Sequence, residues 1–356
     1  MTVALDATYS LGPALSGVGV YCARLIEALA AAAPRDRFLL CYRANRFFRS
    51  LLQAKVPVNA RRRLLEEPLN LLLPRRAGLF HGLNQRLPRY TFARAVTTFH
   101  DLFVMTGEFS TSEFRRRFTA LARDAAARSD HIVAVSAYTA SQVEGLLGVE
   151  PGRISVVHHG VDPVPAFEAP DLAVFRRRLR LERPFLLHVG AIQERKNIRR
   201  LVEAFQELQD GVDLVLAGSE GYAAAQIRHA IAASPARHRI RSLGYVDRAT
   251  LDRLYRSAAA LAFPSLDEGF GVPVLEAMSA GLPVVTSNRA ATCEVAGDAA
   301  LLVDPTDVPS LAAALRRALE DSALRGQLSR KGRARAAEFR WDRAAAETLA
   351  LYRRLL

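Results

Sequence analysis

Residues 263–288 read FPSLDEGFGVPVLEAMSAGLPVVTSN and carry the most specific pattern in the chain. It begins with the end of an apolar run and continues into a turn-rich loop that contains Gly269 and Gly271. Pro273 is tolerated in a first helical turn, Gly281 suits the end of that helix, and a second proline two residues later prevents continuation. The pattern therefore predicts a strand, a glycine loop, a short helix and a further strand.

A helix start of this kind binds phosphate, because its backbone N–H groups and its dipole favour an anion. The residues of the predicted phosphate site are Gly269, Phe270, Gly271 and Val272. Two carboxylates flank them, Glu268 in the loop and Glu276 in the helix. Because carboxylates accept hydrogen bonds from sugar hydroxyls, the pair suits a sugar at one end and a ribose at the other. A capped helix with a solvated acid is the alternative.

A second motif, HVGAIQERKN at 188–197, follows an apolar run. Gly190 allows a tight turn, and Arg195 and Lys196 come just before a predicted helix over 198–208. The lysine is unusual, because only three of the 49 basic residues in the chain are Lys. The two cations can neutralise a diphosphate leaving group, which is the role of a metal in other enzymes. An ion pair with Glu194 at the helix start is the alternative.

The whole chain alternates short apolar runs with longer helical patterns, which is typical of parallel sheets covered by helices. In the first half we expect strands at 3–6, 38–42, 79–82, 95–99 and 131–135, and helices at 19–32, 113–129 and 137–147. In the second half we expect strands at 185–189, 212–217, 239–243, 259–263, 283–287 and 300–303, and consecutive helices from about residue 308. The segment 154–170 holds one strand and then several prolines, so it is the predicted linker.

The predicted fold class is therefore α/β, with two doubly wound Rossmann-like domains. We expect an N-terminal domain over 1–165 and a C-terminal domain over 166–356, whose last helix packs back on the N-terminal domain. Ligands of open α/β sheets bind beyond the carboxyl ends of the strands. Two such sheets that face each other make one interdomain cleft, and the motifs should line it.

The first half offers two further motifs. Residues 6–21, DATYSLGPALSGVGVY, contain Gly17 and Gly19, which predict a flexible loop over the cleft, with a plain tight turn as the alternative. A dinucleotide fingerprint is a poor match here, because Cys22 occupies its third glycine position. The other motif is TFHDL, where His100 follows a strand. His100 can orient the donor sugar or the acceptor hydroxyl with a pKa near working pH, or it is simply packed at the strand end.

Composition limits the cellular setting and the partners. The net charge is 49 − 36 = +13, and the three cysteines are isolated, which fits a reducing compartment without a disulfide framework or metal site. No apolar run reaches the roughly 18 residues that span a bilayer, and the start MTVALDATYS lacks the pattern of a secretory signal. We therefore expect a cytoplasmic protein. The charge alone suggests nucleic-acid binding, but the chain lacks interleaved aromatics and any recognised module, so no nucleic acid is expected.

These motifs together resemble the retaining glycosyltransferases of family 4, which have the GT-B fold. The match covers almost the whole chain and is densest over 136–303. DEGFGVPVLEAMSAGLPVV carries the family's paired glutamates, and ERKN at 194–197 looks like its phosphate-binding Arg-Lys segment, although Glu194 stands where many relatives have proline. SGVGVY at 16–21 is similar to the family's glycine loop, which usually has a second glycine in place of Ser16.

The resemblance implies roles for these residues. Glu268 would contact the donor sugar hydroxyls and Glu276 the ribose, while Arg195 and Lys196 would hold the diphosphate. His100 would lie beside the transferring sugar in an acceptor-binding N-terminal domain. The backbone around Tyr245 and Val246 would touch the base in a nucleotide-sugar-binding C-terminal domain. The family retains the anomeric configuration and uses neither a divalent metal nor another cofactor.

Within the family, the combined motifs look most like bacterial mannosyltransferases of surface polysaccharide assembly, which use GDP-mannose. A UDP-sugar donor, glucose or N-acetylglucosamine, is the first alternative, and a sugar-nucleotide epimerase of the same fold is a weaker one. A phosphorylase would need a pyridoxal-phosphate lysine, which three lysines, one of them already assigned, make improbable.

The acceptor prediction depends on the charge of one segment. Residues 37–94 carry 13 basic and two acidic side chains, a net of +11. RRRLLEEPLNLLLPRR at 61–76 places basic clusters around leucines, and the predicted helix that contains EFRRRFTAL at 113–121 has Phe114 and Phe118 on one face with Leu121. Basic residues around apolar anchors suit peripheral attachment to the anionic inner face of a membrane. We therefore expect a glycan or polyprenyl-diphosphate-linked acceptor, with a soluble acceptor, and leucines that fill the core, as the alternative.

Overall fold

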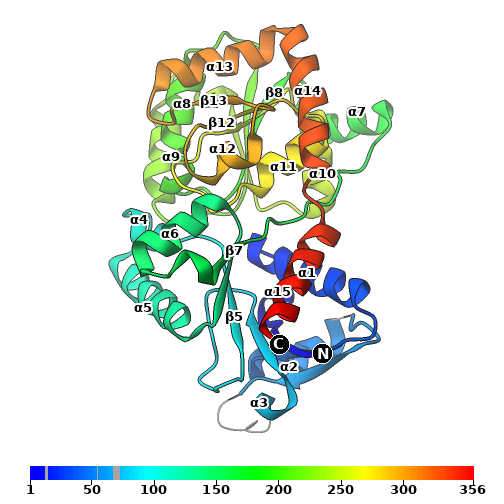
Figure 1. Ribbon diagram of the computed structural model, residues 1–356. Coiled ribbons are helices and arrows are strands. Elements are labelled where there is room, and N and C mark those ends of the chain that lie inside the picture. The colour runs from blue at the N-terminus through cyan, green and yellow to red at the C-terminus, as the bar shows by residue number, and fades with distance from the viewer. Residues whose placement is uncertain (13–14, 54, 67–72) are drawn as a thin grey trace. The chain divides into compact units, whose positions relative to one another are not determined.

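The computed structural model describes residues 1–12, 15–53, 55–66 and 73–356, and it divides the chain into two compact units (Figure 1). Unit 1 consists of Met1–Thr106, Ser112–Gly160 and Phe339–Leu356, and unit 2 consists of Gly107–Thr111 and Val161–Glu338. The division after Gly160 falls inside the segment 154–170 that the prolines mark as a linker.

Unit 1 contains, within the described residues, a seven-stranded parallel sheet in the order β3-β2-β1-β4-β5-β6-β7. Its strands are β1 (Thr2–Asp6), β2 (Arg37–Tyr42), β3 (Ala60–Leu64), β4 (Leu79–Gly82), β5 (Ala95–Phe99), β6 (His131–Ala134) and β7 (Ile154–Val156). Its helices are α1 (Gly17–Ala32), α2 (Ala44–Gln53), α3 (Leu73–Arg76), α4 (Phe103–Thr106), α5 (Ser112–Arg128), α6 (Ala137–Leu147) and α15 (Trp341–Leu355), with single turns η1 (Thr8–Ser10) and η2 (Pro151–Arg153).

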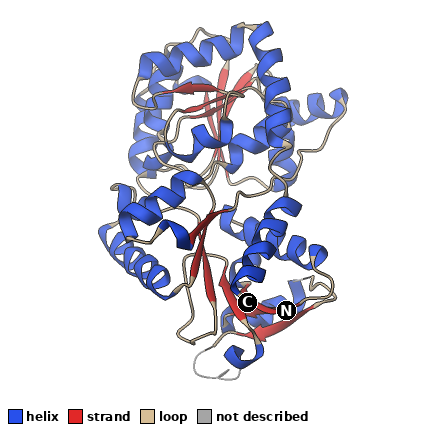
Figure 2. Ribbon diagram, in the orientation of Figure 1, coloured by secondary structure: helices blue, strands red, loops and turns tan. Residues whose placement is uncertain are grey.

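Unit 2 is built, over the same described part of the chain, on a six-stranded parallel sheet in the order β10-β9-β8-β11-β12-β13 (Figure 2). Its strands are β8 (Phe185–Val189), β9 (Asp213–Ala217), β10 (Ile240–Gly244), β11 (Ala260–Phe263), β12 (Val284–Ser287) and β13 (Leu301–Val303). Its helices are α7 (Ala169–Arg178), α8 (Ile198–Gln206), α9 (Ala224–Ala233), α10 (Arg248–Ser257), α11 (Val272–Ser279), α12 (Ala290–Ala296), α13 (Val308–Glu320) and α14 (Ser322–Ala336), with turns η3 (Glu194–Lys196) and η4 (Arg237–Arg239).

In each sheet the order in which the chain adds strands reverses at one point. Strands are added first on one side of the first strand and then on its other side. In unit 1 the reversal lies between β1 and β4, and in unit 2 it lies between β8 and β11. Loops that leave the carboxyl ends of two such neighbouring strands run in opposite directions and leave room for a ligand. In unit 2 these two loops are the ERKN segment and the glycine loop, so the fold brings the predicted motifs together.

The C-terminal helix α15 belongs to unit 1, where it packs along α1. A buried chain of hydrogen bonds links these elements to the sheet. His81 Nδ1 lies 2.5 Å from Tyr352 Oη, His81 Nε2 lies 2.9 Å from Thr98 Oγ1, and the same hydroxyl lies 3.0 Å from Tyr21 Oη. Burial lowers the pKa of His81 to about 3, so its ring is neutral and each nitrogen serves one partner. This network fixes α15 against β4 and β5.

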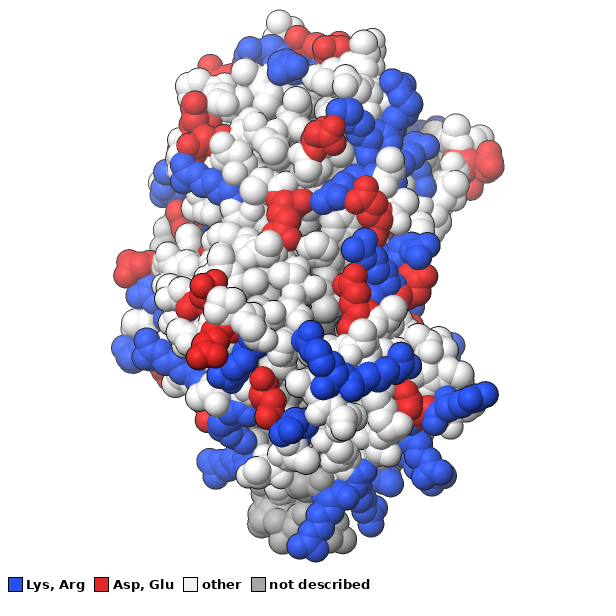
Figure 3. All heavy atoms as spheres, in the orientation of Figure 1, with Lys and Arg blue, Asp and Glu red and all other residues white. Residues whose placement is uncertain are grey.

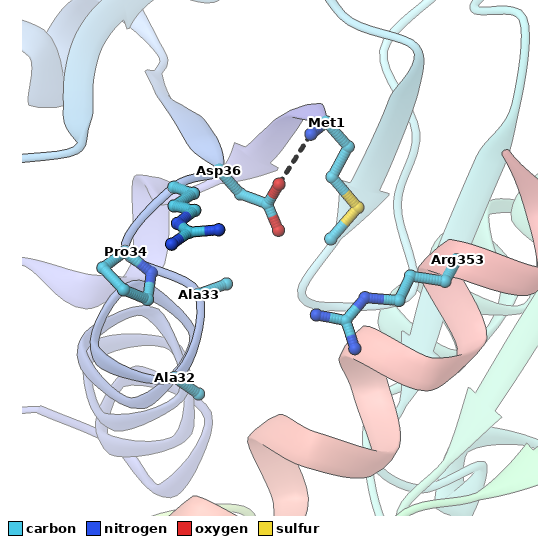
Figure 4. A pocket seen from close by; sticks show the side chains of 7 residues that line it. Met1, Ala32, Ala33, Pro34, Asp36 and Arg353 are labelled. Atoms are coloured by element: carbon cyan, nitrogen blue, oxygen red, sulfur yellow. Dashed lines mark hydrogen bonds and ion pairs between the residues drawn. The ribbon is translucent and has the colours of Figure 1, made fainter.

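A pocket of about 410 Å³ lies at the amino end of β1 in unit 1 (Figure 4). Its lining residues are Met1, Ala32, Ala33, Pro34, Arg35, Asp36 and Arg353. The amino group of Met1 donates to Asp36 Oδ1 at 2.6 Å and closes one wall. The pocket therefore lies at the amino ends of the strands of unit 1, whereas ligands of parallel sheets bind at the carboxyl ends, where His100 follows β5.

Most predicted strands are confirmed within one or two residues, but two regions of unit 1 differ from the prediction. Strand β3 and helix α2 were not expected from the sequence. The helix predicted at 19–32 is confirmed, but it begins two residues earlier, so the predicted flexible loop is wrong at Gly17 and Val18, which form the first turn of α1. Ser16 is the N-cap of that helix, and its hydroxyl accepts a hydrogen bond from Gly19 N at 3.3 Å. Part of the motif, residues 13–14, lies outside the described residues.

Candidate active site

The two loops that follow β8 and β11 hold the strongest candidates in unit 2. Arg195 and Lys196 lie in η3, directly after β8, and Glu268 lies in the loop after β11. Leu266 N donates to Arg195 O at 2.9 Å, which ties one loop to the other. Asn197 Nδ2 donates to the carbonyls of Pro264 and Pro305, at 3.0 and 2.6 Å. Asn197, which closes the ERKN motif, therefore positions the site, a role that the sequence did not suggest.

Glu268 lies between the two cations. Its Oε2 lies 3.0 Å from Arg195 Nη1, and its Oε1 accepts a hydrogen bond from Lys196 Nζ. Arg195 Nη1 also donates to Asp267 O at 2.5 Å. All three charged residues of this cluster are at most 8% exposed. Burial alone would raise the pKa of Glu268, but the Arg195 and Lys196 charges outweigh it and lower the pKa to about 2. The cluster is thus a fully ionised, buried group with a net charge of +1.

Gly190 gives Lys196 the space it needs. Its φ of +145° falls outside the range that residues with a Cβ adopt readily, and a Cβ placed there would lie 3.2 Å from Lys196 Cε. On the other side, a Cβ on Gly218 would lie only 1.9 Å from Gly190 O. The predicted tight turn is therefore confirmed, and it brings the Lys196 side chain past the end of β8 to Glu268.

The glycine loop and helix predicted from 263–288 are confirmed. Gly269, Phe270 and Gly271 are buried, and Val272 is the first residue of α11, whose N-cap is Gly271. The backbone of Ala291 fixes the loop, because its N–H donates to Glu268 O at 3.2 Å. Whether the helix start binds phosphate stays a prediction.

The second carboxylate, Glu276, projects from α11 toward α10. Its Oε1 accepts from Arg248, and its Oε2 accepts from Tyr255 Oη at 2.8 Å. Burial raises the pKa of Glu276, although the Arg248 charge opposes the change. Tyr245, 59% exposed, and the half-buried Val246 lie directly before α10. The structure therefore brings together Glu276 and the segment predicted to touch the base. Arg248 was not identified from the sequence as a site residue, because a single arginine does not stand out in a chain with so many arginines.

In unit 1, His100 follows β5 and is held from several directions. Its Nε2 donates to Leu83 O at 3.0 Å, its backbone N–H donates to Gln85 Oε1 at 3.2 Å, and Gln85 Nε2 donates to Asp101 O at 3.0 Å. The ring of Tyr21 meets the imidazole edge-on at 4.7 Å. Burial lowers the pKa of His100 to about 4, so the expectation of a pKa near working pH is wrong. The ring is neutral, with the proton on Nε2 and an acceptor lone pair on Nδ1.

The two glycines predicted near the ligand differ in their surroundings. Gly17 is exposed at the start of α1, and a Cβ there would meet open space. Gly19 is buried, and a Cβ there would lie 2.9 Å from Tyr9 O. Packing of α1 against η1 is therefore sufficient to explain Gly19, whereas no packing constraint explains Gly17.

The basic segment of unit 1 differs in one respect from the expected surface. Leu65 and Leu73 are buried in a core cluster with Phe80 and Phe92, so they cannot serve as membrane anchors. Residues 67–72 of that motif lie outside the described residues. On α5, Phe114 is exposed and stacks on the half-buried Phe118 with ring centroids 4.0 Å apart, and Leu121 is half-buried.

Helix α2 instead provides an apolar surface. Phe48, Leu51 and Leu52 on α2 are 70%, 54% and 90% exposed. Arg49 and Lys55 are exposed beside them. Figure 3 shows that many other Lys and Arg side chains lie on the surface of unit 1 on the face in view. We call Phe48, Leu51 and Leu52 the α2 apolar face.

Neither a metal site nor a membrane span is found in the described part of the chain. No group of three or more His, Cys, Asp or Glu side chains there could hold a metal ion. No helix formed by the described residues is long and apolar enough to cross a bilayer.

The two parallel-sheet units and the similarity to known proteins identify the chain as a glycosyltransferase with the GT-B fold. Residues 15–164 match the family described as Glycosyltransferase Family 4, and residues 173–335 match the one described as Glycosyl transferases group 1. The O-antigen chain mannosyltransferase B of Escherichia coli is 31% identical over 98% of this chain and 99% of its own length. The chain therefore belongs to glycosyltransferase family 4, and it resembles bacterial mannosyltransferases.

Solved structures with the same fold are more distant in sequence. A sucrose-phosphate synthase from Thermosynechococcus elongatus matches with a TM-score of 0.77 and 22% identity, over 99% of this chain and 98% of that one. Anabaena Alr3699/HepE, solved in complex with UDP-glucose, matches with a TM-score of 0.75 and 19% identity, over 98% of this chain and 99% of that one. At these identities the similarity establishes the fold alone.

Proposed function

We propose that this enzyme is a retaining mannosyltransferase that moves mannose from GDP-mannose to a glycan or polyprenyl-diphosphate-linked glycan, without a divalent metal. The full-length similarity to an O-antigen chain mannosyltransferase supports mannose as the sugar. A UDP-sugar donor is the alternative, because one structural relative was solved with UDP-glucose.

The observation that carries the proposal is the buried cluster of Arg195, Lys196 and Glu268. When the bond between the sugar C1 and the β-phosphate oxygen breaks, the leaving diphosphate gains negative charge. Two cations within hydrogen-bonding distance of one carboxylate are already desolvated and held in place, so they can stabilise that charge once the diphosphate shares them with Glu268. The acceptor oxygen forms the new bond to C1, and its proton is free to pass to the leaving phosphate.

The other candidates take complementary roles in this proposal. Glu268 accepts hydrogen bonds from the sugar hydroxyls and Glu276 from the ribose, while the backbone at Tyr245 and Val246 contacts the base. The start of α11 faces the phosphates. In unit 1, His100 accepts a hydrogen bond from a sugar or acceptor hydroxyl through Nδ1, since its Nε2 proton is committed to Leu83 O.

A donor comparison tests the proposed reaction. The purified enzyme is incubated with GDP-mannose, UDP-glucose or UDP-N-acetylglucosamine, each with and without a lipid-linked oligosaccharide acceptor, and nucleotide release is measured. We expect GDP release from GDP-mannose that depends on the acceptor, and a product whose NMR spectrum keeps the anomeric configuration of the donor. Faster turnover of a UDP-sugar would replace the donor assignment, and isomerisation of the donor without any acceptor would indicate an epimerase.

We further propose that unit 1 attaches peripherally to anionic membrane through the α2 apolar face. Exposed Phe and Leu side chains beside Arg49 and Lys55 suit the boundary between headgroups and acyl chains, at about 1 kcal/mol per basic residue near the surface.

Sedimentation with phosphatidylcholine vesicles containing phosphatidylglycerol tests this membrane attachment. At low salt we expect the wild type to pellet and a Leu51→Glu, Leu52→Glu variant to stay in the supernatant. Val174→Glu on α7 is the matched control, because Val174 is also exposed. Wild-type protein that stays in the supernatant would contradict membrane attachment but not sugar transfer.

A further inference from the structure

The carboxylate of Glu276 is held by one face of the neighbouring helix α10. Arg248 and Tyr255 are seven residues apart, close to two helical turns, so both side chains project from the same face. Asp252 lies between them on that face and pairs with Arg248 through Nη2 and Oδ1 at 2.7 Å. The α10 face therefore presents a cation, an acid and a hydroxyl in a row to α11.

This contact uses only part of the hydrogen-bonding capacity of Glu276. An ionised carboxylate has about four acceptor positions, two on each oxygen. Arg248 occupies a position on Oε1, and Tyr255 occupies one on Oε2. Each oxygen keeps one position for a ligand, and two such positions suit two neighbouring hydroxyls, as on a ribose.

The same contact affects the charge of Glu276. The side chain is only 12% exposed, so burial favours the neutral acid and raises its pKa, and the charge of Asp252 acts in the same direction. Arg248 and Tyr255 act in the opposite direction, because both donate to the ionised form. The charged side chains on the other elements packed against α11 are Glu294 on α12 and Arg325, Arg330, Lys331, Arg333 and Arg335 on α14.

We propose that Arg248, assisted by Tyr255, is a positioning residue for donor binding, which holds the Glu276 carboxylate ionised and oriented toward the ribose. This inference rests on the proposed ribose contact of Glu276. It adds a prediction that the ribose contact alone does not make: removal of the guanidinium changes how nucleotide binding depends on pH. A residue that merely supported the fold would leave that dependence unchanged.

Calorimetric titration of GDP, with UDP in parallel because both carry the same ribose and diphosphate, tests the proposal from mildly acidic to mildly alkaline pH. In the wild type we expect the affinity for GDP to fall on the acid side, where Glu276 becomes protonated. We call this part of the pH profile the acid limb. An opposite charge at this distance lowers a carboxyl pKa by about one to three units, so Arg248→Met should move the acid limb upward by about one unit or more. In the pH range between the two limbs the variant should bind about tenfold more weakly. Arg248→Lys should keep the wild-type limb.

Two further variants make the result interpretable. Arg253→Met, on the same helix, is the control and should bind like the wild type, because the Arg253 guanidinium contacts Phe167 and Ala249 O. Tyr255→Phe removes the other donor and should shift the limb in the same direction by a smaller amount. It also tests the proposal independently if Arg248→Met fails to fold.

The outcomes separate this inference from the proposed function. An Arg248→Met variant with a wild-type pH profile, or with tighter binding at every pH, would overturn the positioning role. If Glu276→Gln weakens GDP binding while Arg248→Met does not, only the role of Arg248 fails. If Glu276→Gln binds GDP like the wild type at every pH, the ribose contact and the positioning role both fail.

Discussion

Glu268 and Glu276 lie eight residues apart around one helix start, yet their surroundings have opposite effects on them. Glu268 lies between Arg195 and Lys196, and its pKa is lowered to about 2. Glu276 faces one partly exposed arginine and a tyrosine, and burial raises its pKa. Glu268 is thus ionised at neutral pH and has strong internal partners, whereas burial shifts the pKa of Glu276 in the opposite direction.

The difference indicates which groups of a ligand each carboxylate and its neighbours can bind. The cations around Glu268 are paired in the described structure, so an arriving diphosphate must share or replace that carboxylate as their counter-ion. Glu276 shares Arg248 with Asp252, and it keeps acceptor positions for uncharged hydroxyl groups. This comparison supports neutralisation of the diphosphate by the cations beside Glu268 and hydroxyl recognition by Glu276, and the following experiments test both assignments.

The largest effect is expected for Lys196→Ala. Loss of one preorganised contact to a developing anion typically lowers the rate by about 10²–10³, and we expect that loss in kcat for the sugar donor. The fold should survive, because Arg195 still pairs with Glu268. Lys331→Ala is the control, since Lys331 pairs with Asp298 at the surface. Near-normal turnover of Lys196→Ala, with a normal unfolding temperature, would remove Lys196 from the mechanism.

The next effect separates the two glutamates by binding and turnover. Glu276→Ala should weaken binding of the free nucleoside diphosphate, because ribose contacts act equally in ground and transition states. Glu268→Ala should depress turnover of the sugar donor more than it weakens binding of GDP. Calorimetry of GDP and steady-state kinetics of both variants provide the measurement. If both bind GDP like the wild type, the ribose assignment is wrong.

The contributions of the two glutamates to the stability of the fold should depend on pH with opposite sign. The pKa of Glu268 is depressed from 4.5 to about 2, so its ionised form stabilises the fold above pH 4.5, and that contribution, roughly 3 kcal/mol, is lost as the pH falls toward 2. The pKa of Glu276 is raised, so its contribution is fully present below pH 4.5 and is lost as the pH rises through the folded-state value.

Denaturant unfolding at several pH values tests these signs. Glu268→Gln should lower the free energy of unfolding at neutral pH by an amount that shrinks in acid, whereas Glu276→Gln should show no such loss at neutral pH. Equal losses for both variants at neutral pH would show that the two surroundings do not differ as described. Saturating GDP should recover part of the stability of Glu268→Gln, because the diphosphate can pair with the two cations left without a carboxylate.

The smallest expected effect is that of metal removal. Because Arg195, Lys196 and the start of α11 provide the positive charge, we expect the rate of sugar transfer to be unchanged by EDTA. The measurement is the initial rate in EDTA against the rate with added magnesium or manganese. Complete loss in EDTA, reversed by either ion, would overturn the proposed use of two side-chain cations in place of a metal.

Much of unit 2 was predictable because local patterns and the final structure agree there. Residues 263–288 combine an apolar run with glycines and prolines at positions that each favour the same strand, loop and helix. The pairing of Lys196 with Glu268 joins residues 72 positions apart, and only the adjacency of β8 and β11 brings them together. Sequence spacing could suggest both residues, but it could not show that each is the partner of the other.

Unit 1 was harder to predict, for identifiable reasons. β3 reads ARRRL, and as the edge strand of its sheet it buries too little to need an apolar pattern. Helix α2 does have an amphipathic pattern, with Phe48 and Leu52 one turn apart, so a helix could have been predicted there, but the pattern could not show that Phe48, Leu51 and Leu52 stay exposed. The glycines of α1 suggested a loop, but Ser16 caps the helix and Gly19 allows close packing on Tyr9. The charge state of His100 depends on burial, which no local pattern reveals.

Thermal unfolding with a panel of nucleotide sugars can show whether Arg195 and Lys196 hold the diphosphate of a GDP-sugar. At a ligand concentration 100 times the dissociation constant, binding should add roughly 2.7 kcal/mol to the free energy of unfolding of the wild type. We predict this stabilisation with GDP-mannose, a smaller one with UDP-sugars, and little with Lys196→Ala at the same concentration. Stabilisation of Lys196→Ala equal to that of the wild type, or no stabilisation by any nucleotide sugar, would rule out this role for the two cations.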